Sequence, residues 1–115
     1  MKYLMIVCID PTIDPASDPA LAAADDPGDT DAWVAEMDGR GVRLEGRALD
    51  PREATTVRVR AGQVLLADGP FAETKEFMVG YDMLDCKDLD EAIEVASKHP
   101  LAKRGAMELR PFSGE

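Results

Sequence analysis

The segment 68–76, DGPFAETKE, holds the densest group of side chains that could take part in chemistry. Asp68 is a candidate general acid or base, provided that burial beside Phe71 raises its pKa. Glu73 and Lys75 could orient a polar ligand. The Gly-Pro pair after Asp68 restricts the backbone and holds these side chains in a fixed direction, as a binding site requires. A turn-capping carboxylate and ion pairs within the loop are the structural alternatives.

Other candidate ligand-binding side chains stand close by in the sequence. Arg58 and Arg60 project from one face of a strand and could hold a carboxylate or phosphate, or could be solvated arginines. Tyr81 follows the segment on the next strand and is either a pocket hydroxyl or a core residue. His99, the only histidine, precedes Pro100 at a helix end, which predicts that it caps helix carbonyls.

The sequence contains no motif typical of a bound metal or cofactor. It has no Ser-His-Asp set, P-loop, Rossmann glycines or zinc-ligand spacing. We therefore expect neither a metal nor a cofactor. Cys8 and Cys86 lie in separate apolar stretches, which predicts two buried free thiols.

Composition and charge narrow the function classes. The 115 residues correspond to one domain, 45% hydrophobic and 31% charged, as is ordinary for a globular cytoplasmic protein. The net charge of −10 argues against nucleic acid and anionic membranes as partners. No apolar run reaches the roughly 18 residues that span a bilayer. The N-terminal apolar run resembles a strand more than a signal peptide.

Hydrophobic periodicity predicts a sequence of β-α-β, a hairpin, and β-α-β. Strands are expected at 3–9, 42–49, 55–60, 63–68, 77–86 and 106–112. One helix covers 32–38, and a second follows the D-x-x-E capping box that begins at Asp88, with Leu89, Ala92, Ile93 and Ala96 as its apolar stripe. The acidic segment 12–31 is either a flap over a site or a solvated insertion, and 19–24 within it could form a short helix.

Two β-α-β units around one sheet predict a ferredoxin-like α+β sandwich with an antiparallel sheet. Two helices cover only one face of that sheet, yet strand 3–9 is apolar at every position. Something must cover the second face. A second copy of the chain is the simplest candidate, because closed two-fold dimers are the commonest assembly.

The chain resembles the YCII-related, or DGPF-domain, family. The matching stretches are MKYLMIV at the start, 54–76, Gly80, DLDEAIEVASKHP at 88–100 and ELRPF at 108–112. The resemblance implies a ferredoxin-like fold of the dimeric α/β-barrel superfamily, in which two sheets pack face to face. It also implies a context beside extracytoplasmic-function sigma factors.

The resemblance transfers only part of the family's proposed chemistry. The wider family has a proposed His–Asp pair in an interface pocket, but the histidine near the first helix has no counterpart here. Asp68 is the carboxylate that the resemblance carries over. Two functions therefore stay open, and the sequence does not decide whether the protein is an enzyme. One is a small-molecule-binding protein or enzyme with a polar pocket near the 68–76 loop. The other is a regulatory accessory protein, in which the motif only builds structure.

Overall fold

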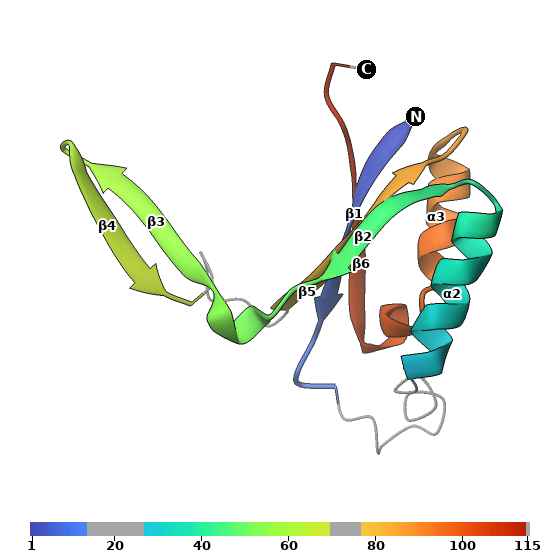
Figure 1. Ribbon diagram of the computed structural model, residues 1–115, viewed down its shortest axis with the longest axis horizontal. Coiled ribbons are helices and arrows are strands. Elements are labelled where there is room, and N and C mark those ends of the chain that lie inside the picture. Colours follow the sequence, from blue (N-terminus) through green and yellow to red (C-terminus); the bar gives the residue numbers. More distant parts are fainter. Residues whose placement is uncertain (14–26, 70–76, 115) are drawn as a thin grey trace.

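A four-stranded antiparallel sheet with helices on one face forms the body of the protein (Figure 1). The computed structural model describes residues 1–13, 27–69 and 77–114. The strand order is β2-β5-β1-β6, comprising β2 (Arg43–Ala48), β5 (Phe77–Asp85), β1 (Lys2–Ile9) and β6 (Gly105–Pro111). β1 pairs antiparallel with both β5 and β6. This arrangement confirms the predicted ferredoxin-like sandwich.

Within the described residues, two α-helices cover the sheet. They are α2 (Pro27–Gly39) and α3 (Leu89–Ser97), and α2 begins earlier than the predicted 32–38. The capping box of α3 is confirmed: Asp88 accepts from the backbone N–H of Glu91 at 2.9 Å, and Glu91 accepts from that of Lys87 at 2.9 Å. Two short 3₁₀ turns, η2 (Pro51–Glu53) and η3 (Pro100–Arg104), precede β3 and β6.

The apolar stripe predicted for α3 is partly wrong. Ala92 and Ala96 are buried as expected, but Val95 is the third buried residue. Leu89 and Ile93 are half-exposed. The buried face is thus rotated toward Val95, because the backbone carbonyl of that residue accepts a hydrogen bond at 3.0 Å from the Trp33 indole of α2.

The core lies between the sheet and the two helices. Alternate residues of β1 point toward the helices, which is the period of two expected of a strand. Cys86 is buried as predicted, whereas Cys8 is only half-buried, and the two cysteines form no disulfide. The buried hydrophobic residues are Tyr3, Met5, Val7, Trp33, Met37, Val42, Leu84, Cys86, Ala92, Val95 and Ala96.

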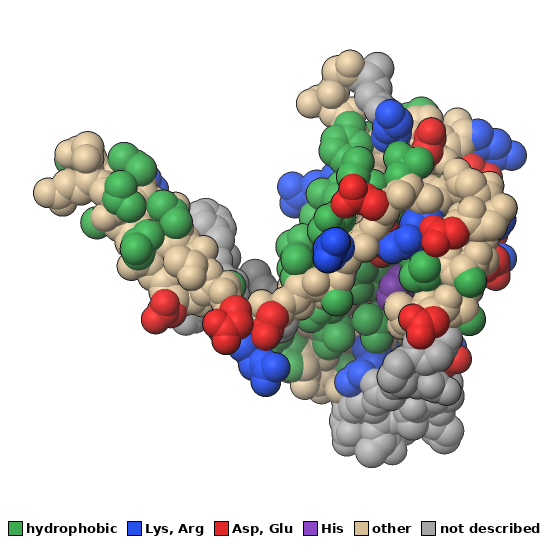
Figure 2. Space-filling view, in the orientation of Figure 1, with side chains coloured by type: hydrophobic (Ala, Val, Ile, Leu, Met, Phe, Trp, Pro, Cys, Tyr) green, Lys and Arg blue, Asp and Glu red, His purple; other side chains and the backbone are tan. Residues whose placement is uncertain are grey.

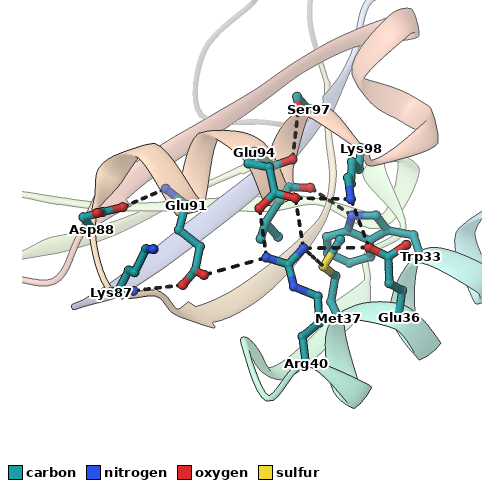
Figure 3. Close-up of polar contacts among 11 residues, drawn as sticks. Trp33, Glu36, Met37, Arg40, Lys87, Asp88, Glu91, Glu94, Ser97 and Lys98 are labelled. Carbon is teal, nitrogen blue, oxygen red and sulfur yellow. Dashed lines mark hydrogen bonds and ion pairs between the residues drawn. The ribbon is translucent and has the colours of Figure 1, made fainter.

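Ion pairs connect the outer surfaces of α2 and α3 (Figure 3). Arg40 donates to both carboxylate oxygens of Glu94, at 2.8 and 3.0 Å. Lys98 lies 3.4 Å from Glu36 and 3.2 Å from Glu94. Because these groups are partly to largely exposed, the network contributes little to the stability of the fold.

A β-hairpin projects away from this body (Figure 1). Its strands, β3 (Thr55–Arg60) and β4 (Gln63–Asp68), have the predicted bounds and form a separate two-stranded sheet. Ala61 and Gly62 connect them with φ of 51° and 74°, as in a type I′ turn. The projection raises the radius of gyration to 16.0 Å, against about 13 Å for a compact chain of this length.

No helix in the described part of the chain is long and apolar enough to cross a membrane.

Candidate functional site

A buried carboxylate on β5 is the main polar feature of the helix-covered side of the sheet. The side chain of Asp82 is 9% exposed, and its Oδ1 accepts a hydrogen bond from Arg43 Nε at 2.8 Å. Burial raises the pKa of the Asp82 carboxyl, and the Arg43 guanidinium opposes that rise. The ion pair therefore keeps a carboxylate in a place where an isolated one would be costly.

Arg43 is fixed by contacts in addition to Asp82. Its Nη1 donates to Asp38 Oδ1 at 3.1 Å and its Nη2 donates to the carbonyl of Gly46 at 3.3 Å. The second oxygen of Asp82, Oδ2, accepts no hydrogen bond from the described residues. Oδ1 is thus held in place by Arg43, while Oδ2 can still accept a hydrogen bond.

Gly46 on β2 makes room for this carboxylate. It pairs with Asp82 across the ladder, and a Cβ added at Gly46 would overlap Asp82 Oδ1. The absence of a side chain at position 46 therefore lets the Asp82 carboxylate lie flat over β2 and reach Arg43.

His99 lies on the same side of the sheet, at the start of η3. It is 4% exposed, and its ring contacts that of Trp33 with 4.7 Å between centroids. Its Nδ1 accepts from the backbone N–H of Leu101 at 3.1 Å, so the neutral ring carries its proton on Nε2. Burial lowers the pKa of His99 to about 4. The prediction that His99 caps the carbonyls of α3 is therefore wrong, because the packing of Trp33 buries the ring and its Nδ1 caps the next turn instead.

These groups meet at a cavity of about 150 Å³ between α2, η3 and the sheet. Asp82, Arg43 and His99 line it together with Thr30 of α2. Its other walls are mainly aliphatic or backbone, formed by Val7, Val34, Gly46, Arg47, Ala48, Val79, Gly80, Tyr81 and Leu101. Such a mostly apolar cavity with a few fixed polar groups is typical of a small-molecule site.

Tyr81 borders the cavity, but its hydroxyl is committed elsewhere. Side chains alternate along β5, so the Tyr81 ring lies on the sheet face opposite to Asp82. There its hydroxyl donates to Glu45 Oε1 at 2.8 Å, a contact that raises the pKa of Tyr81. The role of Tyr81 as a ligand-binding residue stays a prediction.

The other predicted site residues lie on the hairpin or outside the described chain. Asp68 ends β4, where it is exposed and pairs with Thr55, and Arg58 is half-buried in the middle of β3. Neither lines the cavity. Phe71, Glu73 and Lys75 lie outside the described residues, so the structure does not test the grouping proposed for the 68–76 loop.

The start of that loop is tied to the base of the hairpin. Gly69 has φ of 98°, which only glycine adopts readily, and its N–H donates to the carbonyl of Ala54 at 2.7 Å. Its own carbonyl accepts from the buried Thr56 hydroxyl at 2.8 Å. The direction in which the chain leaves Asp68 is therefore fixed by its neighbours.

Sequence reasoning missed the Asp82–Arg43 pair. A signal was present, because Asp82 has the same strand parity as the core residues Leu84 and Cys86 and so had to face the helices. A carboxylate on the buried side of a strand requires a partner. Nothing in the sequence names Arg43 as that partner, since strand order and register decide the pairing. No cluster of three potential metal ligands occurs in the described residues.

Comparison with known proteins agrees with the fold. A family model described as the YCII-related domain matches residues 1–113. An uncharacterised protein of Rhizobium meliloti (strain 1021) is 35% identical over 112 residues, covering 82% of this chain and 90% of that protein.

A solved structure is similar over the whole length of the chain. It is the 5-chloro-2-hydroxyhydroquinone dehydrochlorinase TftG from Burkholderia phenoliruptrix AC1100, in complex with 2,5-dihydroxybenzoquinone. The match has a TM-score of 0.55 at 12% identity and covers 100% of this chain and 96% of that one. At this identity the likeness demonstrates a shared fold and not a shared activity.

Proposed function

Since the chain belongs to the YCII-related family, which the match over residues 1–113 demonstrates, we propose that it binds a small organic molecule in the cavity beside Asp82. One observation carries the proposal: a carboxylate that is nine-tenths buried keeps one oxygen without a donor on the wall of a cavity. Asp82 Oδ2 is not among the fully buried atoms without a partner, so it is accessible, and a ligand or water in the cavity can donate a hydrogen bond to it.

The solved relative supports this class of function. TftG is named as a dehydrochlorinase, and its structure holds a small organic molecule. The cavity described here has about the volume that accommodates one benzene-sized ring. Asp82 can accept a proton from such a molecule, so the site is compatible with a binding protein or with an enzyme.

We extend the proposal to a homodimer, because one face of the hairpin has no cover. Val57, Val59, Val64 and Leu66 share that face through the pairs Val57–Leu66 and Val59–Val64 and are 58 to 69% exposed. Figure 2 shows hydrophobic side chains on the hairpin and on the part of the body that faces it. An isolated two-stranded hairpin is marginal in water, so a covering surface is required.

A second copy supplies such a surface. The sheet face opposite the helices carries Leu4, Ile6 and Met83 in its two central strands, all half-buried. A net charge of −10 on each chain makes contact through charged surfaces costly and leaves these two apolar surfaces as the natural interface. Asp68 is exposed in the single chain. In this dimer the partner would bury it, and burial of a carboxyl group favours the proton transfer expected of a general acid or base.

A matched pair of hairpin variants tests the dimer. Leu66→Gln removes an apolar side chain from the uncovered face, whereas Leu65→Gln makes the same change on the opposite face. Two lost leucines per dimer correspond to about 3 kcal/mol, or roughly a hundredfold weaker association. Sedimentation equilibrium should show this for Leu66→Gln and much less for Leu65→Gln. A wild-type chain that is monomeric at high concentration would remove this part of the proposal.

A ligand screen with cavity variants tests the binding proposal. A ligand present at 100 times its dissociation constant stabilises the folded state by about 2.7 kcal/mol, which a thermal-shift assay detects. Val34→Phe fills the cavity from α2, whereas Ala35→Phe places the same ring on the exposed side of the helix. Hits should disappear in Val34→Phe and persist in Ala35→Phe. Hits that survive in both variants would place the ligand elsewhere.

The uncovered hairpin also favours a second candidate, an accessory protein that binds another protein through this surface. It predicts that Leu66→Gln leaves self-association unchanged and removes a heterologous partner. Cys8 and Cys86 form no disulfide, which fits a reducing compartment, and we place the protein in the cytoplasm under either candidate.

A further inference from the structure

We infer that the cavity selects uncharged ligands that carry a hydroxyl group, and that Asp82 Oδ2 is the atom that receives this hydroxyl. The inference rests on the proposed function, since it names the chemistry of the same cavity. Asp82 is then the residue that determines specificity. The volume and the apolar walls of the cavity would by themselves admit any small ring.

The ion pair determines which atom of Asp82 is available. Arg43 Nε holds Oδ1 at 2.8 Å, and Gly46 leaves no side chain between the two strands. Because Oδ1 already accepts from Arg43, Oδ2 is the oxygen left for a ligand. An ionised carboxylate accepts hydrogen bonds and donates none, so its natural partner on a ligand is a hydroxyl or amine proton.

The other polar wall groups argue against an anionic ligand. The guanidinium of Arg43 donates to Asp82, Asp38 and Gly46, and its charge is balanced by the two carboxylates. His99 is neutral because burial holds its pKa at about 4. Arg47 also borders the cavity, but it pairs with Tyr81 across the ladder, so its side chain lies with the Tyr81 ring on the opposite face of the sheet. The cavity wall therefore has no uncompensated positive charge, and a ligand carboxylate would meet the like charge of Asp82 at short range.

A cationic ligand would gain from Asp82 but lose its hydration among aliphatic walls. Val7, Val34, Val79 and Leu101 form most of the remaining surface. Desolvation of an ammonium in such surroundings costs several kcal/mol, which one carboxylate already paired with an arginine does not recover. A neutral hydroxyl pays far less and gains a charge-assisted hydrogen bond.

Three ring probes of similar size separate these possibilities. Phenol offers a hydroxyl proton, fluorobenzene fills the same volume without one, and benzoate carries a negative charge. The single histidine and single tryptophan of the chain report on the cavity, because His99 lines it and Trp33 contacts His99. Titrations followed by the NMR signals of these two rings give a dissociation constant for each probe.

We expect phenol to bind the wild-type protein at least about tenfold more tightly than fluorobenzene, and benzoate to be the weakest of the three. Asp82→Asn should reduce the preference for phenol to about threefold or less and should improve benzoate binding, because Arg43 loses one of its two balancing charges. Asp85→Asn, the same change at an exposed position of β5, should leave the ranking unchanged.

The outcomes distinguish the inference from the proposal on which it rests. Equal binding of phenol and fluorobenzene to the wild type would overturn the role of Asp82 while leaving a small-molecule cavity in place. Tightest binding of benzoate would overturn the exclusion of anions. If not even fluorobenzene shifts the His99 and Trp33 signals, the cavity takes no ring at all and the proposed function itself fails. The wild-type ranking decides these points even if Asp82→Asn does not fold.

Discussion

Replacing His99 by asparagine should remove a specific part of the acid sensitivity of the fold. His99 is buried and neutral, with a pKa of about 4, against about 6.5 for an exposed histidine. As the pH falls below about 6.5, the unfolded chain takes up the imidazole proton first, and the folded chain takes it up only near pH 4. The stability that the neutral ring contributes is therefore complete above the unfolded pKa and is lost as the pH falls through this window.

The linkage relation gives the size of the effect. Between pH 8 and pH 5 the difference in proton binding at His99 lowers the free energy of unfolding by about 2 kcal/mol. Asparagine does not titrate, and its side-chain oxygen can replace Nδ1 as the acceptor for the Leu101 N–H, since asparagine is among the best N-cap residues. The variant keeps the cap and loses only the proton-binding group.

Urea denaturation at both pH values measures this difference directly. The experiment compares the change between pH 8 and pH 5 in the two proteins at one protein concentration, because association also contributes to stability. Glu94, whose pKa Arg40 holds at about 2, titrates equally in both proteins and cancels. We expect the wild type to lose about 2 kcal/mol more than His99→Asn. Equal losses would show that the imidazole is not buried as a neutral ring, and an NMR titration midpoint near 6.5 would lead to the same conclusion.

Three further substitutions test other parts of the structure. Gly46→Ala should destabilise the protein by about 1–3 kcal/mol in urea denaturation, because its Cβ overlaps the Asp82 carboxylate; an unchanged midpoint would show that the carboxylate does not lie over β2. Ala61→Asn should stabilise the protein by about 0.5–1 kcal/mol in the same assay, since asparagine tolerates the φ of 51° better than alanine; no gain would indicate that the hairpin unfolds separately from the body. Arg40→Met should have a smaller effect than Gly46→Ala and one that fades in high salt, because its contacts with Glu94 are exposed; a large, salt-independent loss would contradict this.

Local patterns in the sequence predicted most of the elements. The hairpin strands 55–60 and 63–68 have the expected bounds because alternation and the Ala61–Gly62 turn act within a few residues. The capping box at Asp88 was predictable for the same reason. The buried face of α3 was only partly predictable, since Leu89 and Ile93 fit a helical stripe by spacing alone. Which side of that helix meets α2 depends on Trp33, far away in the sequence.

The cavity could not be predicted, because its polar groups come from separate elements. Arg43 and Asp82 are 39 positions apart, and His99 belongs to a third element that follows α3. Only the strand order β2-β5-β1-β6 brings the first two together. The composition of the 68–76 loop drew attention because its charged residues are adjacent in sequence. In the described chain, Asp68 at its start stays exposed.

These two regions are related through the strand that follows the loop. β5 begins at Phe77, directly after the 68–76 segment, and carries Asp82 five residues later. β2 leads into the hairpin and carries Arg43 and Gly46. A surface that covers the hairpin therefore restrains β2 and β5, the two strands that carry Arg43, Gly46 and Asp82. If a second copy provides that cover, the Leu66→Gln variant should weaken phenol binding together with dimerisation. Unchanged phenol binding by a monomeric Leu66→Gln chain would show that one chain holds the complete site.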